Sequence, residues 1–227
     1  MGAATPNPRL HCLSNFSFLR GASHPQELVQ KAAELAYHAI AITDECSLSG
    51  IVRAHRASKE YGIKLICGAE FFLDEGIHLV LLAPSRQAYT ELCSLISRAR
   101  LHSEKGSYQL NLDDVRRYSQ YCLAIWINPS ETEQHASKLK HYFTDRLWLA
   151  ISLHKQQQAE PYYFKQYQLA NHHQISMVAC GNIHMHCRQR KPLQDVLSAI
   201  RLNTPLQDLG SQVDVNSERY LKPLSLL

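Results

Sequence analysis

The feature that most constrains the fold of this chain is the regular alternation of two kinds of segment. Short apolar runs of strand length are separated by segments whose apolar residues recur at i, i+3, i+4 and i+7, the spacing of an amphipathic helix. The seven predicted strands are residues 10–18, 39–43, 64–73, 77–83, 121–127, 147–153 and 175–180. The predicted helices are residues 25–36, 48–61, 87–101, 112–118, 131–143, 160–171 and 192–202. This repetition predicts an α/β fold.

The apolar runs also indicate how the strands are buried. Runs such as Ala39-Ile40-Ala41-Ile42 are nearly continuous, which is typical of parallel strands covered by helices on both faces. Only the third and fourth runs lack a helix between them. Seven units without a linker rich in Pro, Gly or Ser favour one barrel-like domain, and an open doubly wound sheet is the alternative.

Local signals mark some of the boundaries. Ser23 is placed to cap the first helix, with Pro25 in its first turn, and Gly62 is placed to end the second helix. After Leu202 we predict no further element. We therefore expect a domain over residues 1–210 and a tail over residues 211–227 that leads to further sequence.

Composition excludes several classes of protein. The 24 Lys and Arg against 20 Asp and Glu give a net charge of +4, too small to indicate nucleic-acid binding by itself. The 7 cysteines are widely spaced and never form CxxC, which is typical of a reduced, cytoplasmic chain. The sequence has no signal-peptide pattern and no apolar run near the roughly 18 residues of a membrane span. We expect a cytoplasmic protein with no membrane partner.

Potential metal ligands gather where the predicted strands end. In parallel α/β folds the carboxyl ends of the strands open on one face, so residues distant in sequence can meet there. The candidates at these ends are His11, Asp44, Glu45, Glu70, His154 and His184. Imidazole nitrogens and carboxylate oxygens suit Zn, Mn or Fe, and neighbouring ions could activate water for attack on a phosphate ester.

Each candidate also has a simpler interpretation. Asp44 and Glu45 could cap the helix that follows them, and one histidine at a strand end is usually a surface or hydrogen-bonded residue. Glu70, beside two phenylalanines, would need a partner or a metal if it were buried. The joint pattern is stronger than any single member of it.

Other motifs are few. The basic residues Arg188, Arg190 and Lys191 follow the seventh strand and could contact a phosphate backbone, or could belong to a solvated loop. The sequence has no GxGxxG, P-loop, GxSxG or HExxH motif. Nucleotide binding by a glycine loop and hydrolysis by a serine or zincin mechanism therefore lack support.

Two long strings carry a resemblance to a known family. Residues 11–25 (HCLSNFSFLRGASHP) and 184–197 (HMHCRQRKPLQDVL), with Ile42-Thr43-Asp44 and Cys67-Gly68-Ala69-Glu70, resemble the PHP (polymerase and histidinol phosphatase) domain. The form they resemble stands at the N-terminus of bacterial C-family DNA polymerases, in their error-prone branch. The resemblance covers essentially the whole chain and implies a distorted (βα)7 barrel.

Active PHP domains hold several metal ions in a cluster of His, Glu and Asp and hydrolyse phosphoesters. In some C-family polymerases this cluster is a proofreading exonuclease. The resemblance implies that His11, Glu70, His154 and His184 are retained metal ligands. It also implies a fifth ligand position at Glu45, where the family has a histidine.

Other positions depart from the family pattern. Leu13 stands where the second histidine of an HxH motif is expected, and Asn182 replaces the aspartate of the last motif. Leucine cannot ligate and asparagine is a weaker ligand than aspartate, so the site is degraded there. Asp44 is expected beside the site rather than in it. We expect Mn, Zn or Mg to bind weakly if at all, and little or no catalysis.

The resemblance supports two functional hypotheses. In the first, the chain is a structural and interaction module with an eroded metal site in a damage-tolerant DNA polymerase. Its partners would be the rest of the polymerase, DNA through the full-length protein, and other mutagenic-repair or replisome proteins. In the second, it is an active phosphoesterase or 3′–5′ exonuclease that uses His11, Glu45, Glu70, His154 and His184. A separate enzyme like histidinol phosphatase is the third and least favoured. The family's palm carboxylates, which hold the metals for nucleotide transfer, are expected beyond residue 227.

Overall fold

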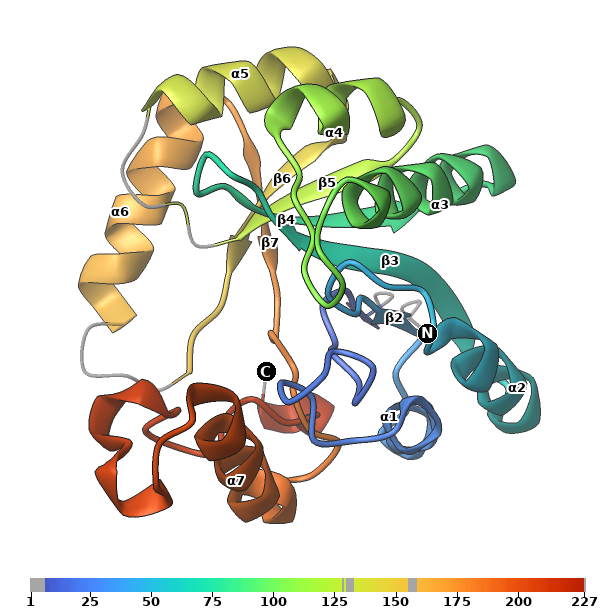
Figure 1. The fold of residues 1–227 in the computed structure, drawn as a ribbon, viewed down its shortest axis with the longest axis vertical. Helices are drawn as coiled ribbons and strands as arrows, with labels where there is room; N and C mark the ends of the chain where they lie inside the picture. Colours follow the sequence, from blue (N-terminus) through green and yellow to red (C-terminus); the bar gives the residue numbers. More distant parts are fainter. Residues whose placement is uncertain (1–6, 128, 130–132, 155–158, 227) are drawn as a thin grey trace, which may run out of the picture. The chain divides into compact units, whose positions relative to one another are not determined.

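Strands and helices follow one another in the computed structural model nearly as the alternation predicts (Figure 1). The structure describes residues 7–127, 129, 133–154 and 159–226. The chain divides into two compact units that interleave in the sequence. Among the described residues, unit 1 contains 7–44, 49–66 and 181–226, and unit 2 contains 45–48 and those between 67 and 180.

The elements have the following bounds. The strands are β1 (Pro8–Arg9), β2 (Ala39–Ile42), β3 (Lys64–Phe72), β4 (His78–Ala83), β5 (Leu123–Ile127), β6 (Leu147–Ile151) and β7 (Ser176–Ala179). The α-helices are α1 (Pro25–Glu34), α2 (Ile51–Tyr61), α3 (Arg86–Leu101), α4 (Leu112–Tyr118), α5 (Glu133–Phe143), α6 (Ala159–His172) and α7 (Lys191–Leu202). Short 3₁₀ turns are η1 (Thr144–Arg146), η2 (Arg188–Arg190), η3 (Leu206–Asp208), η4 (Gly210–Gln212) and η5 (Leu224–Leu226).

The strands are hydrogen-bonded in chain order from β1 to β7, and β3 itself passes from unit 1 into unit 2. The mixed α/β class is confirmed. The expectation of parallel strands is wrong at β4, which runs antiparallel to both β3 and β5, whereas β1–β2, β5–β6 and β6–β7 are parallel. The connection from β3 to β4 is a short turn at Gly76, with a φ of 77°, and a parallel crossover needs a much longer connection.

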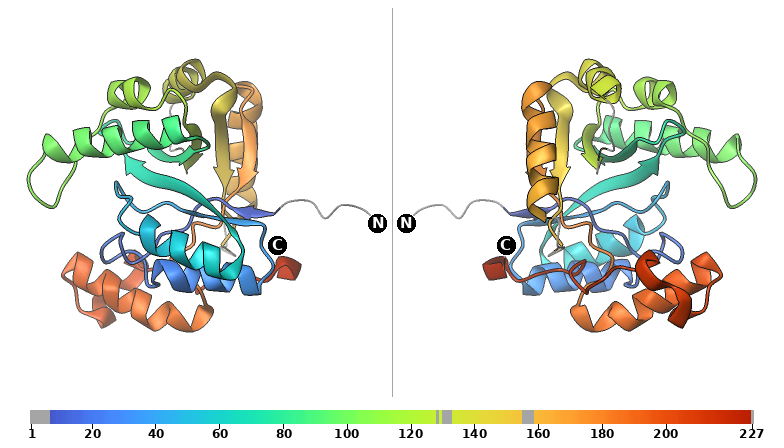
Figure 2. Two further views of the ribbon diagram at one scale, coloured as in Figure 1. Left: turned by 90° about the vertical axis from the view of Figure 1, so that its right-hand side faces the viewer. Right: turned by 90° about the vertical axis from the view of Figure 1, so that its left-hand side faces the viewer.

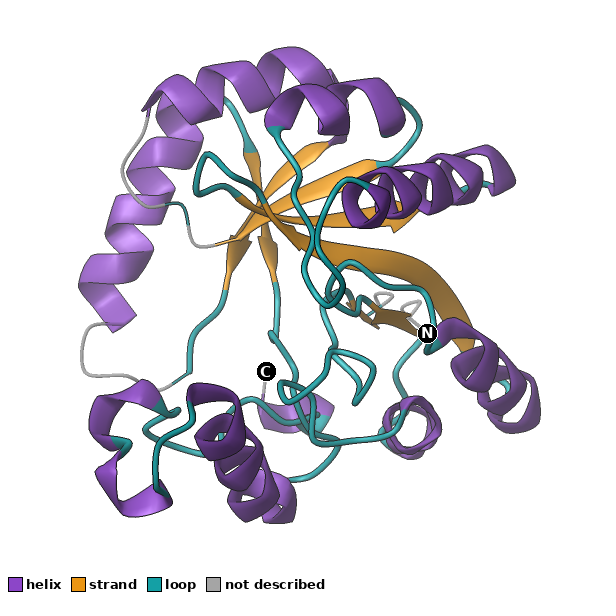
Figure 3. Cartoon of the chain, in the orientation of Figure 1, coloured by secondary structure: helices purple, strands orange, loops and turns teal. Residues whose placement is uncertain are grey.

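The core of unit 2 occupies one face of its strands. Ala69 and Phe71 of β3, Leu79 and Leu81 of β4, and Trp126 of β5 belong to one buried cluster with residues of α3, α4, α5 and α6. Figure 3 shows these helices flanking the strands of the unit. Because side chains alternate between the faces of a strand, Glu70 and His78 point away from this cluster.

The first predicted strand, residues 10–18, is wrong over most of its length. The strand itself is only Pro8–Arg9, Cys12 forms an isolated bridge with Ile183, and the chain then turns. Ser17 N–H donates to the Ser14 carbonyl at 3.0 Å, and Leu19 has a φ of 59°. Serine side chains that bond locally or to a buried carboxylate compete with a sheet ladder, and this segment has two of them.

Some boundary predictions are confirmed and others are corrected. Gly62 ends α2 with a φ of 68°, in the left-handed region that glycine adopts without strain. Ser23 is not the cap of α1: the helix follows His24, whose N–H donates to the Glu27 carboxylate at 2.8 Å. The segment after Leu202 contains the turns η3, η4 and η5, so the prediction of no element there is wrong.

Unit 1 packs its helices in a small group. α1 and α2 lie side by side (Figure 2), and the buried residues Leu28, Val29 and Ala32 of α1 form part of that contact face. None of the described helices combines the length and apolar composition that a membrane span requires.

Two substitutions in one helix test the core of unit 2. Leu95 of α3 is fully buried, whereas Leu101 at the end of the same helix is 80% exposed. We expect Leu95→Ala to lower the free energy of unfolding by about 2–5 kcal/mol through lost burial and a residual cavity. Leu101→Ala should change it by no more than about 0.5 kcal/mol. Urea unfolding followed by circular dichroism measures both, and equal losses would contradict the assigned core.

Candidate metal centre

The first and last motifs of the sequence meet in unit 1. Thr43 N–H donates to the Cys12 carbonyl at 2.9 Å, and the Cys12 N–H donates to the Thr43 hydroxyl at 3.1 Å. On the other side, Leu13 N–H donates to the Ile183 carbonyl at 2.8 Å, and Ile183 N–H donates to the His11 carbonyl at 3.0 Å. The segment from His11 to Leu13 therefore lies between the end of β2 and the segment that precedes His184.

The side chains of His11 and Leu13 are both fully buried. His11 and Leu13 each have 0% exposure. Burial of a leucine side chain stabilises a fold by about 1.5–3 kcal/mol. Leu13 therefore contributes apolar packing at the position where the resemblance implies a second histidine.

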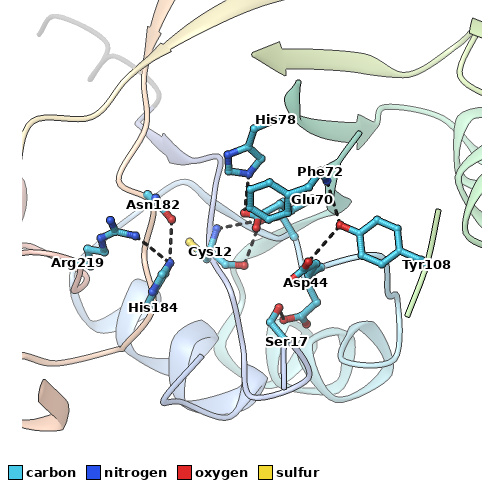
Figure 4. Close-up of polar contacts among 12 residues, drawn as sticks. Cys12, Ser17, Asp44, Glu70, Phe72, His78, Tyr108, Asn182, His184 and Arg219 are labelled. Atoms are coloured by element: carbon cyan, nitrogen blue, oxygen red, sulfur yellow. Dashed lines mark hydrogen bonds and ion pairs between the residues drawn. The ribbon is translucent and has the colours of Figure 1, made fainter. Parts of the chain in front are cut away.

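Asp44 is held by the turn that follows this segment (Figure 4). Its carboxylate accepts hydrogen bonds at 2.7 Å from the Ser14 N–H, the Ser14 hydroxyl and the Ser17 hydroxyl. Burial raises the pKa of Asp44, although the bonds from Ser14 and Ser17 lower it. A Cβ at Gly50 would lie 2.7 Å from Asp44 Oδ2, so only glycine leaves room for this carboxylate. Asp44 does not cap α2, whose N-cap is Gly50.

His184 is engaged by two side chains of unit 1. Its Nε2 lies 2.9 Å from Asn182 Oδ1 and 3.3 Å from Arg219 Nη1, and Arg219 Nε lies 3.0 Å from Asp214 Oδ1 (Figure 4). An imidazole nitrogen has one lone pair or one hydrogen, and a guanidinium can only donate. Nε2 therefore either donates to Asn182 or accepts from Arg219. A metal at this nitrogen would have to displace both groups and would lie beside a fixed positive charge.

In unit 2, Glu70 forms a pair with His78. Phe72 faces His78 in the β3–β4 register, which places His78 diagonally across from Glu70. His78 Nε2 lies 3.4 Å from Glu70 Oε2, and the His78 ring stacks on Phe72 with centroids 4.1 Å apart (Figure 4). The sequence analysis missed His78. The only sequence signal for His78 was its place in the hairpin formed by the third and fourth apolar runs. The register of that hairpin is needed to pair His78 with Glu70.

Glu45 lies in the same unit beside β3. Cys46 N–H donates to the Glu70 carbonyl at 2.8 Å, which aligns the Glu45 segment with Glu70. The Tyr108 hydroxyl donates to Glu45 Oε1 at 3.1 Å and accepts from Phe72 N–H at 3.0 Å. Burial first, and then the Glu45 carboxylate, raise the pKa of Tyr108, so this hydroxyl stays protonated. Glu45 does not cap a helix, and one of its oxygens is engaged by a neutral donor.

His154 follows β6 in unit 2 and is half-buried. Residues 155–158, which come after it, lie outside the described residues. Its assignment as a ligand stays a prediction.

The chemistry of the donors decides where a metal fits. The carboxylate of Glu70 and the imidazole of His78 offer ligand atoms within 4.8 Å of each other, of the kinds that Mn and Zn accept. These two residues fit a metal. Leu13 has no donor atom and cannot ligate a metal. Nε2 of His184 is engaged by Asn182 and Arg219, and the assignment of His184 as a ligand stays a prediction.

The three cations predicted to contact DNA form ion pairs within unit 1. Arg188 Nη2 lies 2.7 Å from Glu218 Oε1, and its guanidinium is 5.1 Å from the centre of the Tyr220 ring. Arg190 pairs with Glu27, and Lys191 pairs with Asp195. Each charge is offset locally, and contact of these residues with DNA stays a prediction.

Two solved structures resemble this chain in fold. A protein of Bifidobacterium adolescentis, described as a metal-dependent phosphoesterase, aligns with a TM-score of 0.59 and 15% identity, over 81% of this chain and 89% of that one. An amidohydrolase of Chromobacterium violaceum, with bound sulfate and no metal, aligns with a TM-score of 0.55 and 17% identity, over 78% of this chain and 87% of that one. These likenesses support the predicted class of fold.

Curated relatives share nearly the whole chain. Proteins named error-prone DNA polymerase are 46% identical over 96% of this chain in Pseudomonas paraeruginosa and 47% identical over 95% in Saccharophagus degradans. The chain spans 21% of the length of each. A family model described as the PHP domain matches residues 9–139, which is more than half of the sequence. The chain therefore belongs to the PHP domain family.

Proposed function

We propose that this chain is the PHP domain of an error-prone DNA polymerase and serves it as a structural and interaction module. The polymerase would copy damaged DNA in the cytoplasm, and its other partners would be mutagenic-repair or replisome proteins. The named relatives support this proposal because their identity extends over almost the whole chain. The chain spans only 21% of their length, so polymerisation would belong to the whole protein.

The engagement of His184 is the observation that carries the non-catalytic role. A hydrolytic centre needs imidazole nitrogens that are free to bind ions. Here Nε2 is 2.9 Å from Asn182 Oδ1 and 3.3 Å from a guanidinium that Asp214 holds in place. Replacement of aspartate by asparagine removes a negative charge, and Arg219 adds a positive one. Both changes lower the affinity for a cation.

The buried Leu13 and the hydrogen-bonded Glu45 would also lower the affinity of the site for a metal ion. One former ligand position has no donor atom, and another has one oxygen bound by the Tyr108 hydroxyl. Too few ligands would remain to hold neighbouring ions close enough to activate water.

A hydrolase is the second candidate, and the Glu70–His78 pair favours it. In that case His11, Glu45, Glu70, His154 and His184, with His78 added, would hold Mn, Zn or Mg. The bound ions would polarise a phosphoester and activate water, while these side chains fix the ions in place.

Metal content and turnover separate the two candidates. We expect the 227-residue chain, purified without chelator, to contain far less than one equivalent of Mn, Zn or Fe by elemental analysis. With Mn added, it should not hydrolyse p-nitrophenyl phosphate or a 3′-labelled single strand. Near-stoichiometric metal, with turnover that is lost in Glu70→Ala but kept in the exposed control Glu104→Ala, would establish the hydrolase instead.

Restoration of the site at His184 gives a further prediction. Asn182→Asp with Arg219→Gln returns a carboxylate and removes the guanidinium. We expect this pair to tighten Zn binding about 10-fold or more, the size of effect seen for groups that orient metal ligands. Competition with a chromogenic chelator measures the Kd. The control is Arg201→Gln with Asn203→Asp, which makes the same change in charge at the end of α7. An unchanged Kd in the restored chain would mean that Arg219 does not block the site.

A further inference from the structure

Helix α2 in unit 1 presents a basic face to solvent. Its buried side consists of Ile51, Ala54, Ala57 and Ser58. The exposed arc carries Arg53, Arg56 and Lys59, and Glu60 is the only carboxylate on it. Lys64, at the start of β3, is also exposed. Four cations and one carboxylate therefore occupy this short stretch of chain.

These cations differ from those at residues 188–191. Within the part of the chain that the structure describes, Arg53, Arg56, Lys59 and Lys64 form no ion pair, whereas Arg188, Arg190 and Lys191 each do. A positive charge with no carboxylate beside it keeps its field in solvent, and several such charges together attract a polyanion.

A groove lies at the C-terminal end of this face. It has a volume of about 560 Å³ and is lined by His55, Ser58, Lys59, Gly62 and Lys64, with apolar contributions from Ala39, Ile63, Leu65 and Ile66. A Cβ at Gly62 would meet no atom within 4 Å, so this wall of the groove is open. The groove joins two ammonium groups to apolar surface, which suits a phosphate joined to a sugar.

Aromatic side chains lie at the opposite end of the helix. The Arg53 guanidinium lies 5.5 Å from the centre of the Phe16 ring, which restrains it by a cation–π contact. Phe18, two residues further along the same turn, is 82% exposed. Aromatic rings at a basic surface are typical of sites on which single-stranded bases stack, and the half-buried Phe16 ring beside Arg53 is of this kind.

We propose that the outer face of α2, with Lys64, binds the sugar–phosphate backbone of DNA. A helix of 11 residues is about 16 Å long, and one strand of DNA places a phosphate about every 3.4 Å along its axis. The helix therefore spans four or five phosphates and carries three cations, with Lys64 as a fourth beyond its C-terminal end. This inference rests on the proposed function, which supplies DNA as the ligand, but it needs no metal and no turnover.

Fluorescence polarisation with labelled single-stranded and duplex oligonucleotides, in the presence of a metal chelator, tests this surface. We expect Arg53→Gln/Arg56→Gln/Lys59→Gln to weaken binding about 10-fold or more at low salt. The slope of log K against log salt should become shallower by about 2 for a single strand and nearly 3 for a duplex, because three phosphate contacts are lost. The conservative variant Arg53→Lys/Arg56→Lys should keep most of the affinity.

The control is Lys31→Gln/Arg98→Gln/Arg116→Gln, which removes the same charge from three ion-paired cations outside both basic stretches and should change the affinity by less than about 2-fold. Thermal unfolding by circular dichroism shows whether each variant is folded at the assay temperature. An equal loss in the control, equal competition by poly-glutamate, or no binding of the parent chain to either DNA at low salt would overturn the proposal. Since the readout is binding without metal, it is independent of the metal and turnover tests of the proposed function.

Discussion

The buried carboxylate of Asp44 is the interaction on which the arrangement of unit 1 depends. An ionised group without water is costly, and burial raises its pKa. Three hydrogen bonds at 2.7 Å from Ser14 and Ser17 offset that cost. They fix the turn that follows Leu13, and the segment before the turn then pairs with Thr43 and Ile183. Removal of Asp44 would therefore disturb the position of His11 and the contact between the first and last motifs.

Most elements could be predicted because their signals are local. The predicted helix 112–118 is α4, and the predicted strand 39–43 is β2 to within one residue. Predictions from apolar periodicity are wrong where contacts between distant residues determine the local structure. Residues 10–18 are apolar enough for a strand, but Ser14 and Ser17 bond a carboxylate about 30 residues away. The cap of α1 fails for the same reason, since the Ser23 hydroxyl bonds His186 instead.

The neighbours of the candidate site residues were harder to predict than the residues themselves. Leu13 and Asn182 are visible in the sequence as departures from the family pattern. His78, Tyr108 and Arg219 could not be assigned, because each acts through strand register or packing across 8, 63 or 35 residues. The neighbours of His184 also determine the charge around its imidazole. An asparagine leaves the imidazole without the negative charge that would favour a bound cation, and a guanidinium held by Asp214 supplies a permanent positive charge there.

The role of the basic residues also depends on where the fold places them and not on their number. A net charge of +4 says little about partners, and the run Arg188-Gln189-Arg190-Lys191 is the most evident basic motif in the sequence. Glu27 and Glu218 lie far from that run in sequence, yet each pairs with one of its arginines in the fold. The cations of α2 are spaced along a helix, so they attract less notice as a motif. They reach solvent together because the opposite side of the helix is apolar and packs inward. Attraction of a polyanion depends on charges that the fold leaves uncompensated, and Arg53, Arg56 and Lys59 on the outer face of α2 are such charges.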